Sequence, residues 1–195
     1  TVIQISPTFG AIHLEDIRVP DCYLIESRLD EKLNIPVMHD DRHGTGVVAL
    51  AAIFNAARRI DRDLSDVTVG QIGLGATGSG IAHLAVQAGI NVRGFDPNPL
   101  AVDMLVEQGG KGASIDEIFD HCDIVVAATG KPGLIPVEKI RPGQIIFALS
   151  NPVPEIEPGA ALAAGAAYAY DGRSVNNYLG FPGLFRGALI AKSQE

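Results

Sequence analysis

The stretch formed by residues 67–80, VTVGQIGLGATGSG, most constrains what this chain can fold into. Its β-branched start predicts a buried strand, which leads through a GxGxxG turn into an apolar helix. In that context the first glycine permits a tight turn, the second lets the backbone approach a pyrophosphate, and the third lets helix and strand pack closely. A glycine-rich turn without a ligand is the alternative. The predicted cofactor-binding residues here are Gly73, Gly75, Ala76, Thr77 and Gly78.

Further candidate cofactor contacts follow the next strands. The strand predicted over residues 90–95 ends at Asp96, where a carboxylate accepts hydrogen bonds from ribose hydroxyls and repels a 2′-phosphate. This position favours NAD over NADP, and the alternative reading, an Asp-Pro turn, is compatible with that role. Two later strands, over residues 123–128 and 144–149, end at Thr129-Gly130 and just before Asn151. We expect Thr129 and Gly130 to flank the nicotinamide ribose, and the Asn151 amide offers a donor and an acceptor to a ligand.

Strands and helices alternate along the chain, which predicts an α/β fold of Rossmann type: a doubly wound, mostly parallel sheet with helices on both faces. We expect residues 1–45 to form a metal- and substrate-site segment that continues from a missing N-terminal domain. Residues 46–195 would form the NAD-binding domain, with the C-terminal helix packing back on the first segment. Because the chain opens with Thr1 and residues 2–5 look like a core strand, we expect further residues upstream.

Composition narrows the class of function. The chain has 195 residues, of which 47% are hydrophobic and 19% charged, as expected of a soluble globular protein. A formal net charge of −8 argues against a nucleic-acid partner. No signal peptide and no apolar run of about 18 residues is present, so we expect no membrane partner. Cys22 and Cys122 form no CxxC pair and fit buried thiols in a reducing cytoplasm, which is the predicted location.

Two predicted strands, over residues 11–14 and 34–38, each lead into a carboxylate pair, Glu15-Asp16 and Asp40-Asp41. Carboxylates at the ends of apolar strands are costly to bury unless a cation balances them, and Mg²⁺ or Mn²⁺ prefers such hard oxygen ligands. The alternative is that these residues only cap a helix and a turn. His39 and His43 could suggest zinc, but their i, i+4 spacing falls across a glycine-containing turn, and capping or core hydrogen bonds explain both residues better.

Four stretches taken together resemble the malic enzyme family in its shorter, bacterial form. They are AIHLEDIRVPD at 11–21, IPVMHDDRHGT at 35–45, LSNPVPEI at 149–156 and VNNYLGFPGLFRG at 175–187. The resemblance covers nearly the whole chain in consistent order. It implies oxidative decarboxylation of L-malate to pyruvate and CO₂ with reduction of NAD, or less favourably NADP, dependent on Mg²⁺ or Mn²⁺. The full-length enzymes are expected to be homodimers.

The same resemblance assigns roles to individual residues. Glu15, Asp16 and Asp41 match the metal ligands, and Asp40 beside them is the candidate catalytic residue. Asn151 and Asn177 match the amides that contact substrate and nicotinamide.

Two departures from the family pattern leave alternatives open. The family's N-terminal domain carries a Tyr and a Lys that serve as acid and base, and this chain has no counterpart of them. Arg42 stands where the bacterial family usually has Gln, which adds a charge near the metal. A non-catalytic NAD-binding module therefore stays possible, although such a module needs no metal ligands. Malolactic-type chemistry, which uses the same motifs without net release of NADH, also stays open.

Overall fold

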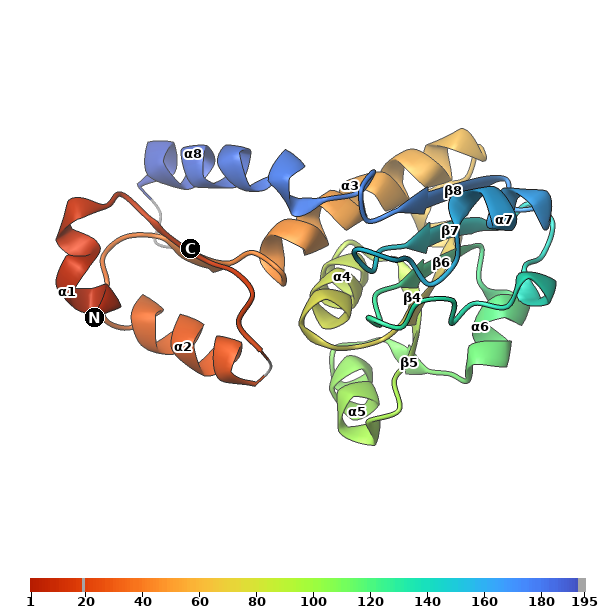
Figure 1. Cartoon of the computed structure of the whole chain (residues 1–195), viewed down its shortest axis with the longest axis horizontal. Coiled ribbons are helices and arrows are strands. Elements are labelled where there is room, and N and C mark those ends of the chain that lie inside the picture. Colours follow the sequence, from red (N-terminus) through yellow and green to blue (C-terminus); the bar gives the residue numbers. More distant parts are fainter. Residues whose placement is uncertain (19, 193–195) are drawn as a thin grey trace.

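A six-stranded parallel sheet forms the core of the computed structural model, which describes residues 1–18 and 20–192 (Figure 1). The strand order is β5-β4-β3-β6-β7-β8, so the chain starts in the middle, builds one half and then crosses to build the other. This order confirms the predicted Rossmann-type fold. The strands are β3 (Thr68–Ile72), β4 (Asn91–Phe95), β5 (Lys111–Gly112), β6 (Ile124–Ala127), β7 (Ile145–Ala148) and β8 (Tyr168–Asp171).

Helices cover both faces of the sheet and bury its apolar side chains. Alternate strand residues such as Val69 and Ile72 point to opposite faces and enter two separate cores. One core packs against α3 (His43–Arg59), α4 (Ala76–Gln87) and α5 (Pro99–Glu107). The other packs against α6 (Ile115–His121) and α7 (Pro158–Ala163). Because both faces are covered, the central strands β6 and β7 are buried along their whole length.

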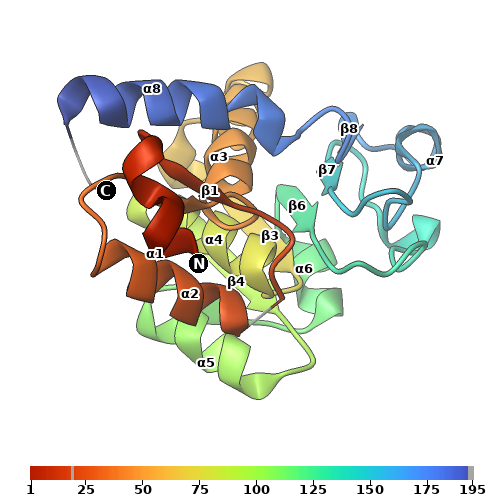
Figure 2. The same cartoon turned by 60° about the vertical axis from the view of Figure 1, so that its left-hand side comes forward.

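A smaller lobe lies beside this domain (Figure 1). Its two parallel strands, β1 (Ile12–Leu14) and β2 (Val37–His39), pair in register and share a small core with α2 (Asp21–Asp30). The last helix, α8 (Phe181–Ala191), lies on the other side of these strands from α2 (Figure 2). Segments from the two ends of the chain therefore build one lobe, and the predicted boundary at residue 45 stays a prediction.

Helix α3 joins the lobe to the domain through a close crossing with α4. A Cβ atom added to Gly80 of α4 would lie 2.3 Å from the carbonyl oxygen of Arg42, and one added to Gly46 of α3 would lie 2.9 Å from the side chain of Leu84. Only glycine fits such an approach of two backbones. The crossing therefore fixes where the start of α3 lies relative to the start of α4.

The structure corrects several predicted elements. Residues 2–5 form a short helix, α1 (Val2–Ile5), instead of a strand, because the Gln4 and Ile5 N–H groups donate to the carbonyl of Thr1 and none of its side chains is buried. The apolar pattern predicts helices over residues 47–59 and 184–192, but α3 begins at His43 and α8 begins at Phe181. Strand β5 was not predicted, because two residues are too few to show a period.

Short 3₁₀ turns make up the remaining elements, at Ser6–Thr8, Leu64–Asp66, Val137–Lys139 and Asn177–Leu179. Among the described helices, none has the length and hydropathy needed to cross a membrane.

Candidate functional site

A cavity of about 350 Å³ lies between the two lobes, at the carboxyl ends of β1, β2, β6 and β7. It gathers most of the predicted metal and substrate residues from widely separated parts of the chain. Ligands of doubly wound sheets bind at this edge, where the strand order reverses. The lining comprises Glu15, Asp16, Asp41, Thr45, Thr77, Ala128, Gly130, Leu149, Ser150, Asn151, Val175, Asn176 and Asn177.

The acidic side of the cavity is built by the turn after β2. Asp41 Oδ2 accepts a hydrogen bond from the Asp16 N–H at 3.1 Å, which joins the two predicted carboxylate pairs. Asp16 itself has a φ of 57°, in the left-handed region that Asp tolerates better than most residues. Helix α3 begins without a side-chain cap, so neither Asp40 nor Asp41 serves the capping role that was the alternative.

Glu26 of α2 holds this acidic turn in place from outside the cavity. Its Oε1 accepts the His39 N–H at 2.7 Å and lies 3.1 Å from His43 Nε2, and its Oε2 lies 3.7 Å from an Arg42 nitrogen. Burial alone would raise the pKa of Glu26, but the bonds from His43 and His39, with the charge of Arg42, lower it below its ordinary value of 4.5. The carboxylate therefore stays ionised.

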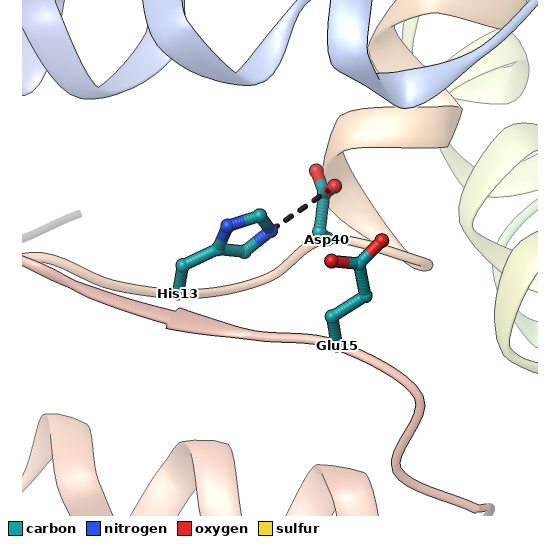
Figure 3. A group of neighbouring side chains, drawn as sticks. All are labelled: His13, Glu15 and Asp40. Carbon is teal, nitrogen blue, oxygen red and sulfur yellow. Dashed lines mark ion pairs between the residues drawn. The ribbon is translucent and has the colours of Figure 1, made fainter.

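Asp40 does not line the cavity and is 1% exposed. Its Oδ2 is 3.1 Å from Nε2 of His13, and ligand atoms of His13, Glu15 and Asp40 lie within 4.8 Å of one another (Figure 3). Burial, reinforced by Glu15 and Asp41, raises the pKa of Asp40 above its ordinary 3.8, although His13 acts in the opposite direction. A Cβ on Gly44 would collide with this carboxylate, so the glycine makes room for it.

The ring of His13 is held in place by α8. It lies 4.7 Å from the ring of Phe181 and 5.8 Å from that of Phe185, measured between ring centroids. In Figure 3 the imidazole points along the strand toward Asp40, and Glu15 reaches up beside it. The sequence reasoning missed His13, whose only signal is its position two residues before Glu15 on β1.

The donor set fits a hard divalent cation. Four carboxylates, Glu15, Asp16, Asp40 and Asp41, converge here, while Arg42 is turned toward Glu26. Such a concentration of negative charge is expensive unless a cation compensates it. Glu15 belongs both to the predicted metal set and to the compact group with His13 and Asp40. Asp16 and Asp41 lie outside that compact group but face the same cavity.

The glycine turn lies at the start of α4, and its Thr77 lines the cavity. Gly73 has a φ of +86°, and a Cβ on Gly78 would lie 1.9 Å from the Gly73 carbonyl oxygen, so both positions require glycine. Asp96 closes the turn, because its Oδ2 accepts the Leu74 N–H and its Oδ1 the Asn98 N–H, each at 2.8 Å. Gly75 and Asp96 border a second cavity, of about 850 Å³, between α4 and α5.

The loops after β6 and β7 complete the site. Gly130 and Asn151 line the first cavity, and the Asn151 amide donates to the carbonyl of Gly172 at 3.4 Å. Asn177, just before α8, donates to Oε1 of Glu15 at 3.5 Å, across 162 positions of sequence. Thr129 does not line the cavity; its N–H and hydroxyl bind Glu155 instead. Glu155 lies within the motif LSNPVPEI, but nothing in the sequence marked it as a site residue.

A glycine turn at the switch point of a parallel sheet defines a dinucleotide-binding domain, and the carboxylates Glu15, Asp16 and Asp41 line a cavity beside it. Comparison with known proteins agrees with this class. Residues 44–131 match the family model described as "D-isomer specific 2-hydroxyacid dehydrogenase, NAD binding domain".

Similarity over the whole chain is more specific. The chain is 59% identical over 197 residues to NAD-dependent malic enzyme 1 of Bacillus subtilis, covering all of this chain and 45% of that protein. It is 38% identical to an NADP-dependent malic enzyme of Salmonella typhimurium, covering 96% of this chain and 28% of the relative. The crystal structure of NAD-dependent malic enzyme from Thermotoga maritima superposes with a TM-score of 0.87 at 33% identity, covering 98% of this chain and 57% of that one.

Over its whole length the chain is therefore similar to one part of these malic enzymes. It spans about half the length, or less, of the relatives that it matches.

Proposed function

We propose that this chain forms the cofactor- and metal-binding part of an enzyme that converts L-malate to pyruvate and CO₂ with reduction of NAD, in the presence of Mg²⁺ or Mn²⁺. The observation that carries the proposal is the shared cavity, where Glu15 and Asp41 face Gly130 and Asn151 across one small volume. A metal-held hydroxy acid and a nicotinamide ring have to meet in such a place. The site residues and their roles are part of the proposal.

Each wall of the cavity has its own task. When bound, NAD would supply a hydride acceptor, and a divalent cation would supply a Lewis acid that stabilises negative charge on the oxygens of the substrate. Glu15, Asp16 and Asp41 would hold the cation. Asn177 and Asn151 would orient the substrate and the nicotinamide, with amide groups that both donate and accept. Asp96 favours NAD, because a 2′-phosphate would meet its negative charge.

Asp40 is suited to handling a proton. Its carboxyl is buried, its pKa is raised by that burial, and it lies 3.1 Å from an imidazole. A carboxyl with a raised pKa and a neighbouring histidine can exchange a proton at pH values nearer neutrality than an ordinary Asp. Asp40 would thus hold or relay a proton beside the substrate, with His13 as its partner.

Calorimetric titration of Mn²⁺ and of NAD into the Asp41→Ala variant tests the assignment. We expect Mn²⁺ binding to be lost, because one hard oxygen ligand is removed, while NAD affinity stays unchanged because the glycine turn is intact. Asp103→Ala, an exposed change on α5, is the control. Unchanged Mn²⁺ binding in the Asp41 variant would remove the metal assignment. In the full-length enzyme we further propose a homodimer, which sedimentation velocity measures directly.

A further inference from the structure

Glu155 is a buried carboxylate on the segment that joins β7 to α7. It is 0% exposed and does not line the cavity. Burying a carboxylate is expensive unless hydrogen-bond donors compensate it, so a fully buried Glu requires a set of donors arranged around it. The groups that donate hydrogen bonds to Glu155 come from two loops, the one after β6 and the one after β7.

One carboxylate group ties together the loops after β6 and β7. Glu155 Oε1 accepts the Thr129 N–H at 2.7 Å, the Thr129 hydroxyl at 2.8 Å and the Ser150 hydroxyl at 2.5 Å. Its Oε2 accepts the Ser150 N–H at 3.2 Å. The Ser150 oxygen in turn accepts the Gly130 N–H at 2.8 Å. All four groups that reach Glu155 are donors, which is the arrangement that an ionised acceptor requires.

The tied loops form one half of the ligand cavity. Gly130, Ser150 and Asn151 line it directly. In the sheet, β6 and β7 lie on one side of β3, whereas β4, which ends at Asp96, lies on the other. In a doubly wound dinucleotide site the adenosine half lies on the side of that acid, so the nicotinamide half lies along the loops that Glu155 ties.

We propose that Glu155 is a positioning residue for the nicotinamide half of bound NAD. It fixes Thr129, Gly130 and Ser150, and through Ser150 the adjoining Asn151, in one arrangement without touching the ligand. The inference rests on the proposed function. The proposal assigns different residues to the two halves of the cofactor. The glycine turn and Asp96 bind the adenosine diphosphate half, and Glu155 fixes the conformation of the loops that bind the nicotinamide half.

The test compares NADH with ADP, which carries only the adenosine half, by calorimetry on the 195-residue chain. In Glu155→Gln an amide replaces the acceptor, so the charge is lost and an N–H group faces donors. We expect NADH affinity to fall roughly tenfold or more, as loss of a charge-assisted bond implies, while ADP affinity stays unchanged. Glu157→Gln, two positions on and exposed, should change neither affinity.

A second variant covers the case in which Glu155→Gln does not fold. Ser150→Ala removes the hydroxyl that joins Gly130 to Glu155, and we expect the same selective loss of NADH affinity. Equal losses for NADH and ADP in the variant that folds would overturn the inference, because that pattern indicates a general structural role. NADH affinity equal to that of the parent chain would overturn it as well. A parent chain that binds neither ligand would instead contradict the proposed function.

Discussion

Asp40, which is buried, and Glu26, which is partly buried, are two carboxylates near the same turn whose pKa values are shifted in opposite directions. Asp40 lies next to Asp41, which lines the cavity, and its pKa is raised by burial and by its acidic neighbours. Glu26 faces two histidines and an arginine, whose bonds and charge lower its pKa against the effect of burial. The protein therefore stabilises the turn from the Glu26 side and tolerates an unfavourable charge on the Asp40 side, as expected of a functional residue.

We expect Asp40→Asn to make the chain more stable at pH 7. A folded-state pKa above 3.8 means that the folded form binds more protons than the unfolded form just above pH 3.8, so the ionised group opposes folding at neutral pH. Removing that charge should stabilise the fold by about 1 kcal/mol. Urea unfolding at pH 7 and at pH 3.5 measures the difference. The gain should vanish at the lower pH, and a gain that persists there would contradict the charge argument.

Glu26→Gln should have the opposite effect. Because the folded-state pKa of Glu26 lies below 4.5, its ionised form favours folding above that pH, and the benefit is lost as the pH falls through the folded-state pKa. At pH 7 we expect a loss of about 1–3 kcal/mol, the range for a hydrogen bond to a charged group. Urea unfolding of the variant at pH 7 and at pH 3.5 measures this loss. Glu31→Gln, at an exposed position just after α2, is the control. Equal stability of parent and variant at pH 7 would show that Glu26 contributes nothing to the turn.

At the scale of elements, the crossing of α3 and α4 sets the spacing between the acidic turn and the glycine turn. Helix α3 begins two residues after Asp41, and α4 begins at Ala76, within the glycine turn. Where the helices cross, Gly80 lies against the backbone of Arg42 and Gly46 against Leu84. A side chain here would move one turn relative to the other, and a shift of about 1 Å in such a site is costly for catalysis.

We expect Gly80→Ala to lose about 1–3 kcal/mol of unfolding free energy, because the added methyl group overlaps a backbone carbonyl that cannot rotate away. Gly187→Ala makes the same chemical change within α8, where an added Cβ would have nothing within 4 Å. That control should stabilise its helix by up to about 1 kcal/mol. Chemical denaturation measures the free energy of unfolding of both variants. Equal changes in the two would mean that helix propensity, and not the contact between α3 and α4, determines the effect.

The elements that could be predicted from the sequence are those whose hydrophobic or capping pattern extends over several residues. Buried strands such as Ile124–Ala127 and Ile145–Ala148 form continuous apolar runs, and Ser114 with Glu117 marks the start of α6 through a capping box that the structure contains. Residues 2–5 have equally β-prone side chains, yet they form a helix, because no neighbouring strand pairs with them. The hydrogen bonds of Glu26 and Glu155 could not be predicted from the sequence, because most of their partners lie 13 or more positions away. The bond between Glu155 and Ser150, five positions apart, is the exception.

For the whole molecule, the cavity is lined by the residues that we propose for metal, cofactor and substrate, but it offers few groups that could carry a proton. Among the described residues that line it there is neither a lysine nor a tyrosine. We therefore expect the 195-residue chain to bind NAD but to produce negligible NADH from malate and Mn²⁺, by absorbance at 340 nm. A full-length malic enzyme is the positive control. Normal malate-dependent NADH formation by the short chain would show that Asp40 and His13 suffice as proton carriers.

The bond between Asn177 and Glu15 has a consequence for the order in which the protein is made. It joins residues 162 positions apart, and α8, which begins four residues after Asn177, covers His13. The parallel sheet can assemble strand by strand during synthesis, but contacts of such separation form late and slowly. The contacts of residues 12–16 with Asn177 and α8 can therefore form only after the segment around Asn177 has left the ribosome. During translation the sheet of the cofactor domain can therefore form before the cavity is complete.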